Sequence, residues 1–244
     1  MEIIKSLAND KIKRIAKLQD KKNRYQEKLF LIEGYHLIEE ANNLDLLKIV
    51  ISDDSKVLES FNCEKILVDN AIIKKLSTTQ TPQNIIGVVE MFEKPFSNSD
   101  KYLLLDGVND PGNLGTIIRT SLALGIDNIY MCNNTVDLYN EKVLRSTQGA
   151  IFKANIKKCD LRDAFQNLKE KQVKIVSSCL DTDTYINQLP KLDKFCLVIG
   201  NEANGISLTS KENADYLVKI PMDNKIESLN VAVASAILIY KLNN

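Results

Sequence analysis

Three short segments in the second half of the sequence are rich in Gly and Asn and carry a few charged side chains. They read LLLDGVNDPGNLGTIIRTSLALG over residues 103–125, LVIGNEANGIS over 197–207 and VKIPMDNKIESLNVAVASA over 218–236. Each begins with an apolar run that is typical of a parallel strand buried on both faces. Because the loops that leave the carboxyl ends of parallel strands gather at one edge of a sheet, we expect these segments to form one ligand site.

The polar side chains of these segments are the candidate site residues. Asn113 and Arg119 lie in the first segment, Glu202 in the second, and Ser228 and Asn230 in the third. Taken singly, Asn113 and Ser228 also fit helix N-caps. Arg119 also fits a solvated position on its helix, and Glu202 a surface acid in a turn. Asn230 has no strong structural reason to be Asn, and it is the joint arrangement that favours a functional role.

Several common nucleotide-binding and catalytic patterns are missing from these segments. Gly107, Gly112 and Gly115 do not match G-x-G-x-x-G, the second strand of this half ends in MCNN without an acid, and no Walker A lysine motif occurs. The only histidine, His36, lies far from the three segments in the sequence, so a histidine base is not expected. No Cys, His and carboxylate cluster suggests a metal, and we expect none.

The surrounding sequence alternates between strand and helix patterns in both halves. In the second half, apolar runs predict strands over 101–106, 128–132, 153–158, 173–178, 195–200 and 215–220, and helical patterns cover about 114–124, 140–147, 160–171 and 228–241. In the first half, strands are predicted over 29–32, 46–52, 65–69 and 84–92, with helices between them. The fold class is therefore α/β, with a small α/β/α unit followed by a parallel-sheet unit. A stretch rich in Pro, Ser and Asn at 93–101 marks the boundary, giving domains 1–96 and 97–244.

The first thirty residues are basic although the whole chain has no net charge. They hold nine Lys and Arg against four Asp and Glu, a local charge of +5. Ile12, Ile15 and Leu18 recur at helical spacing, so the basic side chains lie on the outer face of an early helix. This face is either simply solvated or a surface that binds phosphates.

The cysteines and the apolar runs indicate where the protein works. The five cysteines are widely spaced without a C-x-x-C pair, which predicts reduced thiols, with Cys132, Cys179 and Cys196 in the core. The start of the chain lacks the apolar stretch of a signal peptide, and the longest apolar run, 231–240, is too short to span a bilayer. We therefore expect a soluble cytoplasmic protein with no membrane partner.

The three segments together resemble the motifs of the SpoU/TrmH family of RNA ribose methyltransferases, within the SPOUT superfamily. The matching residues are Asn113, Gly115 and Arg119 in the first motif, Gly200, Asn201, Glu202 and Gly205 in the second, and Ile220, Pro221, Met222, Ser228, Leu229 and Asn230 in the third. They occur in the family's order over about 102–242. The opening SLANDKIKRIAKLQ…LFLIEGYHLIEEA resembles the ribosomal-protein-like substrate-binding domain of many members.

The resemblance implies a function and a site. It implies methyl transfer from S-adenosylmethionine to a ribose 2′-hydroxyl of RNA, most simply 23S-type ribosomal RNA. It also implies a C-terminal trefoil knot and a homodimer with an interfacial active site. The implied cofactor-binding residues are Gly200, Ile220 and Leu229, and the implied catalytic residues are Arg119, Asn113, Glu202, Ser228 and Asn230. Arg119 acts either as a base or as a charge clamp on the neighbouring phosphate.

Two other functions and two positions for the last helix stay open. A transfer RNA methyltransferase of the same family is one alternative, although the added basic domain counts modestly against it. A non-catalytic RNA-binding protein is the other, although it would not need the five catalytic residues. The helix over 229–242 is apolar on nearly every face, which predicts burial all round, in the core or at a dimer interface.

Overall fold

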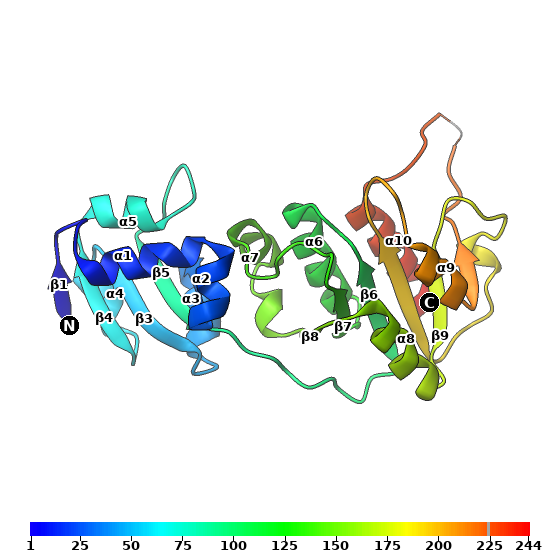
Figure 1. The fold of residues 1–244 in the computed structure, drawn as a ribbon, viewed down its shortest axis with the longest axis horizontal. Helices are drawn as coiled ribbons and strands as arrows, with labels where there is room; N and C mark the ends of the chain where they lie inside the picture. The colour runs from blue at the N-terminus through cyan, green and yellow to red at the C-terminus, as the bar shows by residue number, and fades with distance from the viewer. Residues whose placement is uncertain (224) are drawn as a thin grey trace. The chain divides into compact units, whose positions relative to one another are not determined.

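The computed structural model of the protein describes residues 1–223 and 225–244. The chain forms two compact units (Figure 1). The first unit contains Met1–Phe92 together with Asp137–Phe152, and the second contains Glu93–Val136 and Lys153–Asn244. A segment from the middle of the chain thus packs with the N-terminal residues. A single boundary position in the sequence cannot describe such a division.

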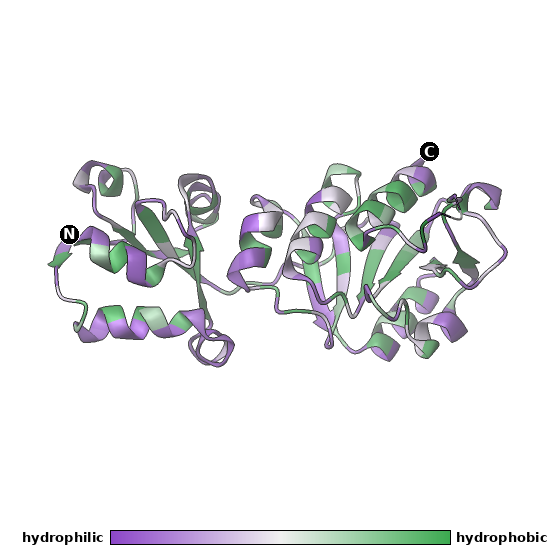
Figure 2. Cartoon of the chain, turned by 90° about the horizontal axis from the view of Figure 1, so that it is seen from above, coloured by the Kyte–Doolittle hydropathy of each residue, from purple (hydrophilic) through white to green (hydrophobic). Residues whose placement is uncertain are grey.

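The first unit is built on a five-stranded mixed sheet with the order β1-β4-β3-β5-β2. The bounds of its strands are β1 Glu2–Ile4, β2 Leu29–Glu33, β3 Leu47–Ser52, β4 Glu64–Val68 and β5 Ile85–Glu90. Strands β1, β4 and β3 are parallel, and β5 runs antiparallel to both β3 and β2. Helices lie on both faces of this sheet (Figure 2), so the predicted α/β/α arrangement is confirmed.

Helices α1 and α5 pack on one face of this sheet and α3 on the other. The bounds of the helices in this unit are α1 Asp10–Ala16, α2 Lys21–Glu27, α3 Tyr35–Asn42, α4 Ser55–Glu59, α5 Asn70–Leu76 and α7 Glu141–Thr147, with short 3-10 turns at Lys17–Gln19 and Ala150–Phe152. Ile12 and Ile15 of α1 are buried with Ile72 and Ile73 of α5, as the helical spacing predicted.

Strand β1 was not predicted. The pattern of the first thirty residues indicates only the helix with the basic face. Its three residues pair in parallel with β4, Glu2 opposite Ile66 and Ile4 opposite Val68. A strand this short cannot show a period of two, so its position depends on the sheet edge it joins. The early helix is also interrupted, because the Asp20 side chain caps the start of α2.

A buried ion pair fixes the mid-chain segment within the first unit. The Arg24 guanidinium donates from Nη2 to Asp137 Oδ2 at 2.6 Å, and the two side chains are only 5% and 7% exposed. The Tyr25 hydroxyl donates to the other carboxylate oxygen of Asp137 at 2.7 Å, and Arg24 Nη1 donates to the carbonyls of Leu18 and Gln19. Burying charge is costly, and these bonds satisfy most of the polar atoms involved.

The second unit is built on a six-stranded, wholly parallel sheet with the order β11-β9-β10-β6-β7-β8. Its strands are β6 Lys101–Asp106, β7 Asn128–Cys132, β8 Asn155–Cys159, β9 Lys174–Ser178, β10 Phe195–Gly200 and β11 Tyr216–Val218. All six residues of β10 are buried, as expected for a central parallel strand. The predicted parallel sheet is therefore confirmed, and the trefoil knot stays a prediction.

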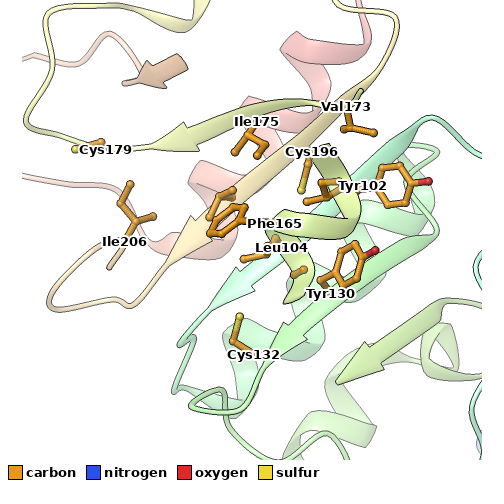
Figure 3. Packing of buried hydrophobic residues seen from close by; sticks show 13 residues of the cluster. Tyr102, Leu104, Tyr130, Cys132, Phe165, Val173, Ile175, Cys179, Cys196 and Ile206 are labelled. Atoms are coloured by element: carbon orange, nitrogen blue, oxygen red, sulfur yellow. The ribbon is translucent and has the colours of Figure 1, made fainter. Parts of the chain in front are cut away.

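Helices cover both faces of this sheet. They are α6 Pro111–Ala123, α8 Leu161–Glu170, α9 Leu208–Asn213 and α10 Val231–Asn243. On one face, Phe165 of α8 packs in a cluster with Tyr102, Leu104, Tyr130 and Ile175 (Figure 3). On the other face, α6 and α10 pack against each other. Cys132, Cys179 and Cys196 are buried and all five thiols are free, which confirms their predicted state.

The composition of the last helix predicted burial on every side. Within one chain, the structure buries only part of its surface. Ala232, Leu238 and Ile239 are buried. Val233, Ile237 and Tyr240 are 49%, 39% and 62% exposed, and their spacing of four and three residues places them along one side of the helix. Among the described residues, no helix is both long enough and apolar enough to cross a membrane.

Candidate functional site

A cavity lies at the carboxyl ends of the parallel strands of the second unit. Its volume is about 650 Å³. Its wall is formed by the ends of β9 and β10 and by the loops that follow them and β11. The wall residues are 178–181, 199–206, 219–220 and 227–231, with Lys211, Met222 and Ala234. This is the sheet edge at which the sequence predicted a ligand crevice.

The turn that follows β10 depends on two glycines. A Cβ on Gly200 would lie 2.2 Å from the carbonyl carbon of Gly205 and 2.3 Å from the nitrogen of Ile206, so only glycine fits this close backbone approach. Gly205 has a φ of +68°, which favours glycine. Asn201 closes the turn through reciprocal backbone bonds with Gly205 and donates from its side chain to the carbonyl of Gly107 at 2.9 Å.

A buried carboxylate at the end of β6 supports the same turn. Asp106 is 3% exposed, and its Oδ2 accepts bonds from Ser207 N at 2.8 Å and from Ser210 Oγ at 2.6 Å. These bonds hold the start of α9 and so fix the far end of the β10 loop. Neither Asp106 nor the side-chain brace of Asn201 was predicted as part of the site. An acid that ends an apolar strand directly before a glycine was the available signal.

Glu202 connects the second loop to the first. Its Oε2 accepts a bond from Asn109 N at 3.1 Å, and its Oε1 accepts bonds from Asp110 N and Asn113 Nδ2, both at 3.1 Å. Glu202 thus holds the turn that begins α6.

Asn113 connects Glu202 to the third loop. Its Oδ1 accepts a bond from Asn230 Nδ2 at 3.0 Å, while its own Nδ2 donates to Glu202. The alternative interpretation of Asn113 as an N-cap is wrong, because Asp110 caps α6 and accepts from Asn113 N at 2.8 Å. The three loops are therefore joined by one chain of side-chain hydrogen bonds, Glu202–Asn113–Asn230.

Asn230 has a structural role that no local pattern in the sequence indicates. It is the N-cap of α10, and its Oδ1 accepts bonds from Ala232 N at 2.9 Å and Val233 N at 3.3 Å. The helix therefore begins three residues later than predicted, and Ser228 does not open it. Because capping uses only the oxygen of the amide, the Asn230 nitrogen is free to reach Asn113.

The hydrogen bonds around Glu202 change its acidity. Partial burial raises the pKa of the Glu202 carboxyl, but the bonds from Asn109, Asn113 and Asp110 together outweigh this effect. Its pKa therefore lies below the ordinary value, and the group is a carboxylate near neutral pH. A carboxylate is the better acceptor for three N–H donors, so its charge stabilises the joined loops.

The structure separates Arg119 from the other predicted site residues. Gly200, Glu202, Ile220, Ser228, Leu229 and Asn230 all line the cavity. Arg119 lies on the exposed side of α6 and is not part of the cavity wall. Within the described residues, its guanidinium has neither a hydrogen bond nor an ion pair. Asn113 is not part of the wall either, but its side chain bonds to Glu202 and Asn230, which are. Of the five predicted catalytic residues, Arg119 alone neither lines the cavity nor bonds to a residue that does.

The cavity has the size and chemistry that S-adenosylmethionine needs. Its volume lies within the range of about 300–1,000 Å³ that is usual for small-molecule sites. Ile220 and Leu229 offer apolar surface for an adenine ring, and Gly200 brings the backbone of the turn after β10 into the wall. The carboxylates of Asp181 and Glu227 are also in the wall, where they suit a cofactor with positive charge. Among the described residues, no group of three or more His, Cys, Asp or Glu could hold a metal ion.

Comparison with known proteins identifies the class. Residues 100–240 match the SpoU rRNA Methylase family, and residues 9–87 match the MRM3-like substrate binding domain. The chain is 36% identical over 246 residues to the 23S rRNA (guanosine(2553)-2′-O)-methyltransferase RlmP of Bacillus subtilis (strain 168), with 99% of each chain covered.

Solved structures agree with this match over nearly the whole chain. The AdoMet-bound rRNA methyltransferase from Sinorhizobium meliloti aligns with a TM-score of 0.89 and 27% identity, covering 99% of this chain and 97% of that one. A structure described as an RNA 2′-O ribose methyltransferase aligns with a TM-score of 0.84 and 26% identity, covering 98% and 97%.

The fold and the site define an S-adenosylmethionine-dependent RNA methyltransferase. The chain belongs to the SpoU rRNA methylase family, with an N-terminal substrate-binding segment of the MRM3-like kind. The resemblance seen in its three motifs, the enzyme class and the cofactor are thereby confirmed.

Proposed function

We propose that the protein transfers a methyl group from S-adenosylmethionine to a ribose 2′-hydroxyl of 23S-type ribosomal RNA. The observation that carries this proposal is the Glu202–Asn113–Asn230 chain, which joins the three motif loops at the cofactor cavity. The names of the Bacillus subtilis relative and of the aligned ribose methyltransferase support the 2′-hydroxyl as the acceptor.

The residues of the cavity have separate roles in this proposal. Gly200, Ile220 and Leu229 bind the cofactor, largely through backbone groups at the ends of the strands. When bound, the cofactor supplies a methyl group that its sulfonium already activates. Ser228 and Asn230 orient the ribose beside it, and no side chain in the cavity wall is a histidine that could act as a base.

Arg119 acts at the cavity of a second copy of the chain. It is exposed and is not part of the cavity wall of its own chain, which leaves its guanidinium available to the site of a second copy. The exposed apolar side of α10, made by Val233, Ile237 and Tyr240, supplies a surface on which two copies associate as a homodimer. There the Arg119 guanidinium clamps the phosphate beside the target ribose and stabilises negative charge developing on O2′. A role as a base is less favoured, because guanidinium hardly ever loses its proton in proteins.

The two domains divide the work. Residues 1–96 bind the RNA and residues 97–244 carry out methyl transfer, in agreement with the two matched families. The protein works in the cytoplasm, where its five free thiols stay reduced.

Mapping of 2′-O-methyl groups tests the proposal. Ribosomal and transfer RNA from cells with and without the protein are compared, beginning with the 23S region modified by the Bacillus subtilis relative. A 2′-deoxy substitution at the target nucleotide should then abolish methyl transfer in vitro, because the 2′-hydroxyl is the nucleophile. Transfer to the substituted RNA would show base methylation, and a site found only in transfer RNA would show the alternative substrate.

A further inference from the structure

The first unit contains a second cavity, of about 230 Å³, that none of the motifs touches. Three segments form it: the turn between β2 and α3 at 33–37, the loop before β5 through Thr79, Thr81 and Gln83, and the end of α7 at Arg145 and Gln148. All three belong to the first unit, and α7 comes from the chain between β7 and β8.

One cation in this cavity has no counter-charge. Arg145 is partly buried, and its Nη1 donates to the hydroxyl of Thr78 at 3.0 Å. Among the described residues, no carboxylate lies within ion-pairing distance of its guanidinium. The acid in the wall, Glu33, is occupied by three donors, Ser77 Oγ, Thr79 Oγ1 and Gln83 N, at 2.6, 2.9 and 2.8 Å. Four of the five N–H groups of Arg145 therefore remain for an anion.

The same cavity offers an aromatic ring and amide groups. Tyr35 is 39% exposed, and its hydroxyl donates to Asn84 Oδ1 at 3.0 Å, which holds the ring in place. Unpaired RNA bases stack on such rings, and base edges form hydrogen bonds with amides such as those of Gln83 and Gln148. The backbone N–H groups at the start of α3, which no side chain caps, add donors to the same wall.

Ion pairs account for much of the basic N-terminal segment, the other candidate RNA surface. Four of its nine cations bind carboxylates: Lys11 binds Glu2 and Glu64, Lys13 binds Asp10, Arg14 binds Glu27, and Arg24 binds Asp137. Its remaining lysines give long-range attraction to RNA without distinguishing paired from unpaired strands.

We infer that the cavity at 33–37, 79–83 and 145–148 binds one unpaired nucleotide of the substrate RNA. Arg145 holds its phosphate, Tyr35 stacks on its base, and the two glutamines contact the base edge. This inference rests on the proposed function for the identity of the RNA. It also means that the substrate-binding unit is complete only when a helix from the methylase half of the chain packs into it.

The test uses the full-length protein and unmodified 23S ribosomal RNA made by transcription. Arg145→Gln and Tyr35→Leu should each weaken RNA binding about tenfold, the scale of one lost stacking or charged contact. Tyr35→Phe keeps the ring and should bind as the wild type does. Arg162→Gln, which removes an exposed arginine of α8, is the control for charge alone. S-adenosylmethionine affinity and thermal melting should stay unchanged in every variant.

A fully paired duplex made from the bound RNA segment gives the second readout. Arg145→Gln should change its affinity by less than twofold, because a duplex has no free nucleotide to insert. Equal loss for duplex and 23S RNA, or wild-type affinity of both Arg145→Gln and Tyr35→Leu, would overturn the inference. RNA binding is measured without turnover, so a wild-type protein that binds but never methylates RNA would contradict only the proposed function.

Discussion

Two sets of polar side chains, one in each unit, are used in opposite ways. In the first unit, Arg24 and Asp137 are almost fully buried and bind each other, Tyr25 and backbone carbonyls. In the second unit, Glu202 and Asn230 are exposed at the mouth of a cavity, and Arg119 lies exposed on α6. One set of polar groups is buried inside the protein, and the other remains accessible to a ligand.

This difference predicts what each set contributes. A buried charge must keep its partner or destabilise the fold, whereas an exposed charge contributes little to stability and can serve binding or catalysis. Substitutions in the first set should therefore change the free energy of unfolding, and substitutions in the second should change turnover.

The largest effect is expected for Asp137. Replacement of Asp137 by Ala leaves the Arg24 charge buried without a partner and should cost about 3–5 kcal/mol of stability, measured by urea unfolding. The control is Asp10→Ala, which removes the exposed partner of Lys13 and should cost less than about 1 kcal/mol. Equal, small losses in both variants would show that the buried pair does not hold the mid-chain segment in the first unit.

Arg119→Ala should reduce turnover and leave the free energy of unfolding nearly unchanged. Stability should change within about 0.5 kcal/mol, because the side chain is exposed, and cofactor affinity should be kept. Turnover should fall at least about 100-fold, the usual scale for a lost transition-state partner. Arg119→Lys should rescue poorly, because a bidentate clamp needs the planar guanidinium. Normal methylation by Arg119→Ala would remove this residue from the active site.

Mixing two inactive variants shows in which chain Arg119 acts. Gly200→Ala places a Cβ against the backbone of Gly205 and should displace the turn that forms part of the cofactor cavity, so that the cofactor no longer binds. If Arg119 serves the partner's cavity, dimers that combine Arg119→Ala with Gly200→Ala regain one complete site, and activity returns on mixing. If mixtures stay as inactive as either variant alone, Arg119 acts within its own chain.

The smallest expected effect is the pH dependence that Glu202 contributes. Its pKa is lowered in the folded protein, so its stabilising contribution is fully present above the ordinary pKa of glutamate, about 4.3. The contribution is lost as the pH falls through the lower folded value. Melting temperatures of the wild type and Glu202→Gln should therefore converge between about pH 5 and pH 3. A difference that stays constant over this range would mean that the carboxylate charge does not stabilise the joined loops.

The pattern of apolar residues predicted much of the fold. It failed where long-range contacts determine the position or the exposure of an element. The buried runs of β6 and β10 mark parallel strands by their length and composition alone. The three-residue strand β1 has no pattern of its own, and only its pairing with β4 defines it. The exposed row on α10 was missed because a uniformly apolar sequence does not show which side faces solvent.

The sequence by itself determined the two sheet patterns, the order of the three motif loops and the glycines that those loops require. It also supplied Asn113, Glu202, Ser228 and Asn230 as site residues, because residue type and spacing are local properties, but it did not supply Asp106. Only the tertiary structure decided which atoms meet. It joined Glu202 to Asn113 and Asn113 to Asn230, left Arg119 outside the cavity, and packed Asp137–Phe152 into the first unit. Such contacts join residues about a hundred positions apart, and their partners are set by the folded backbone, not by any local pattern.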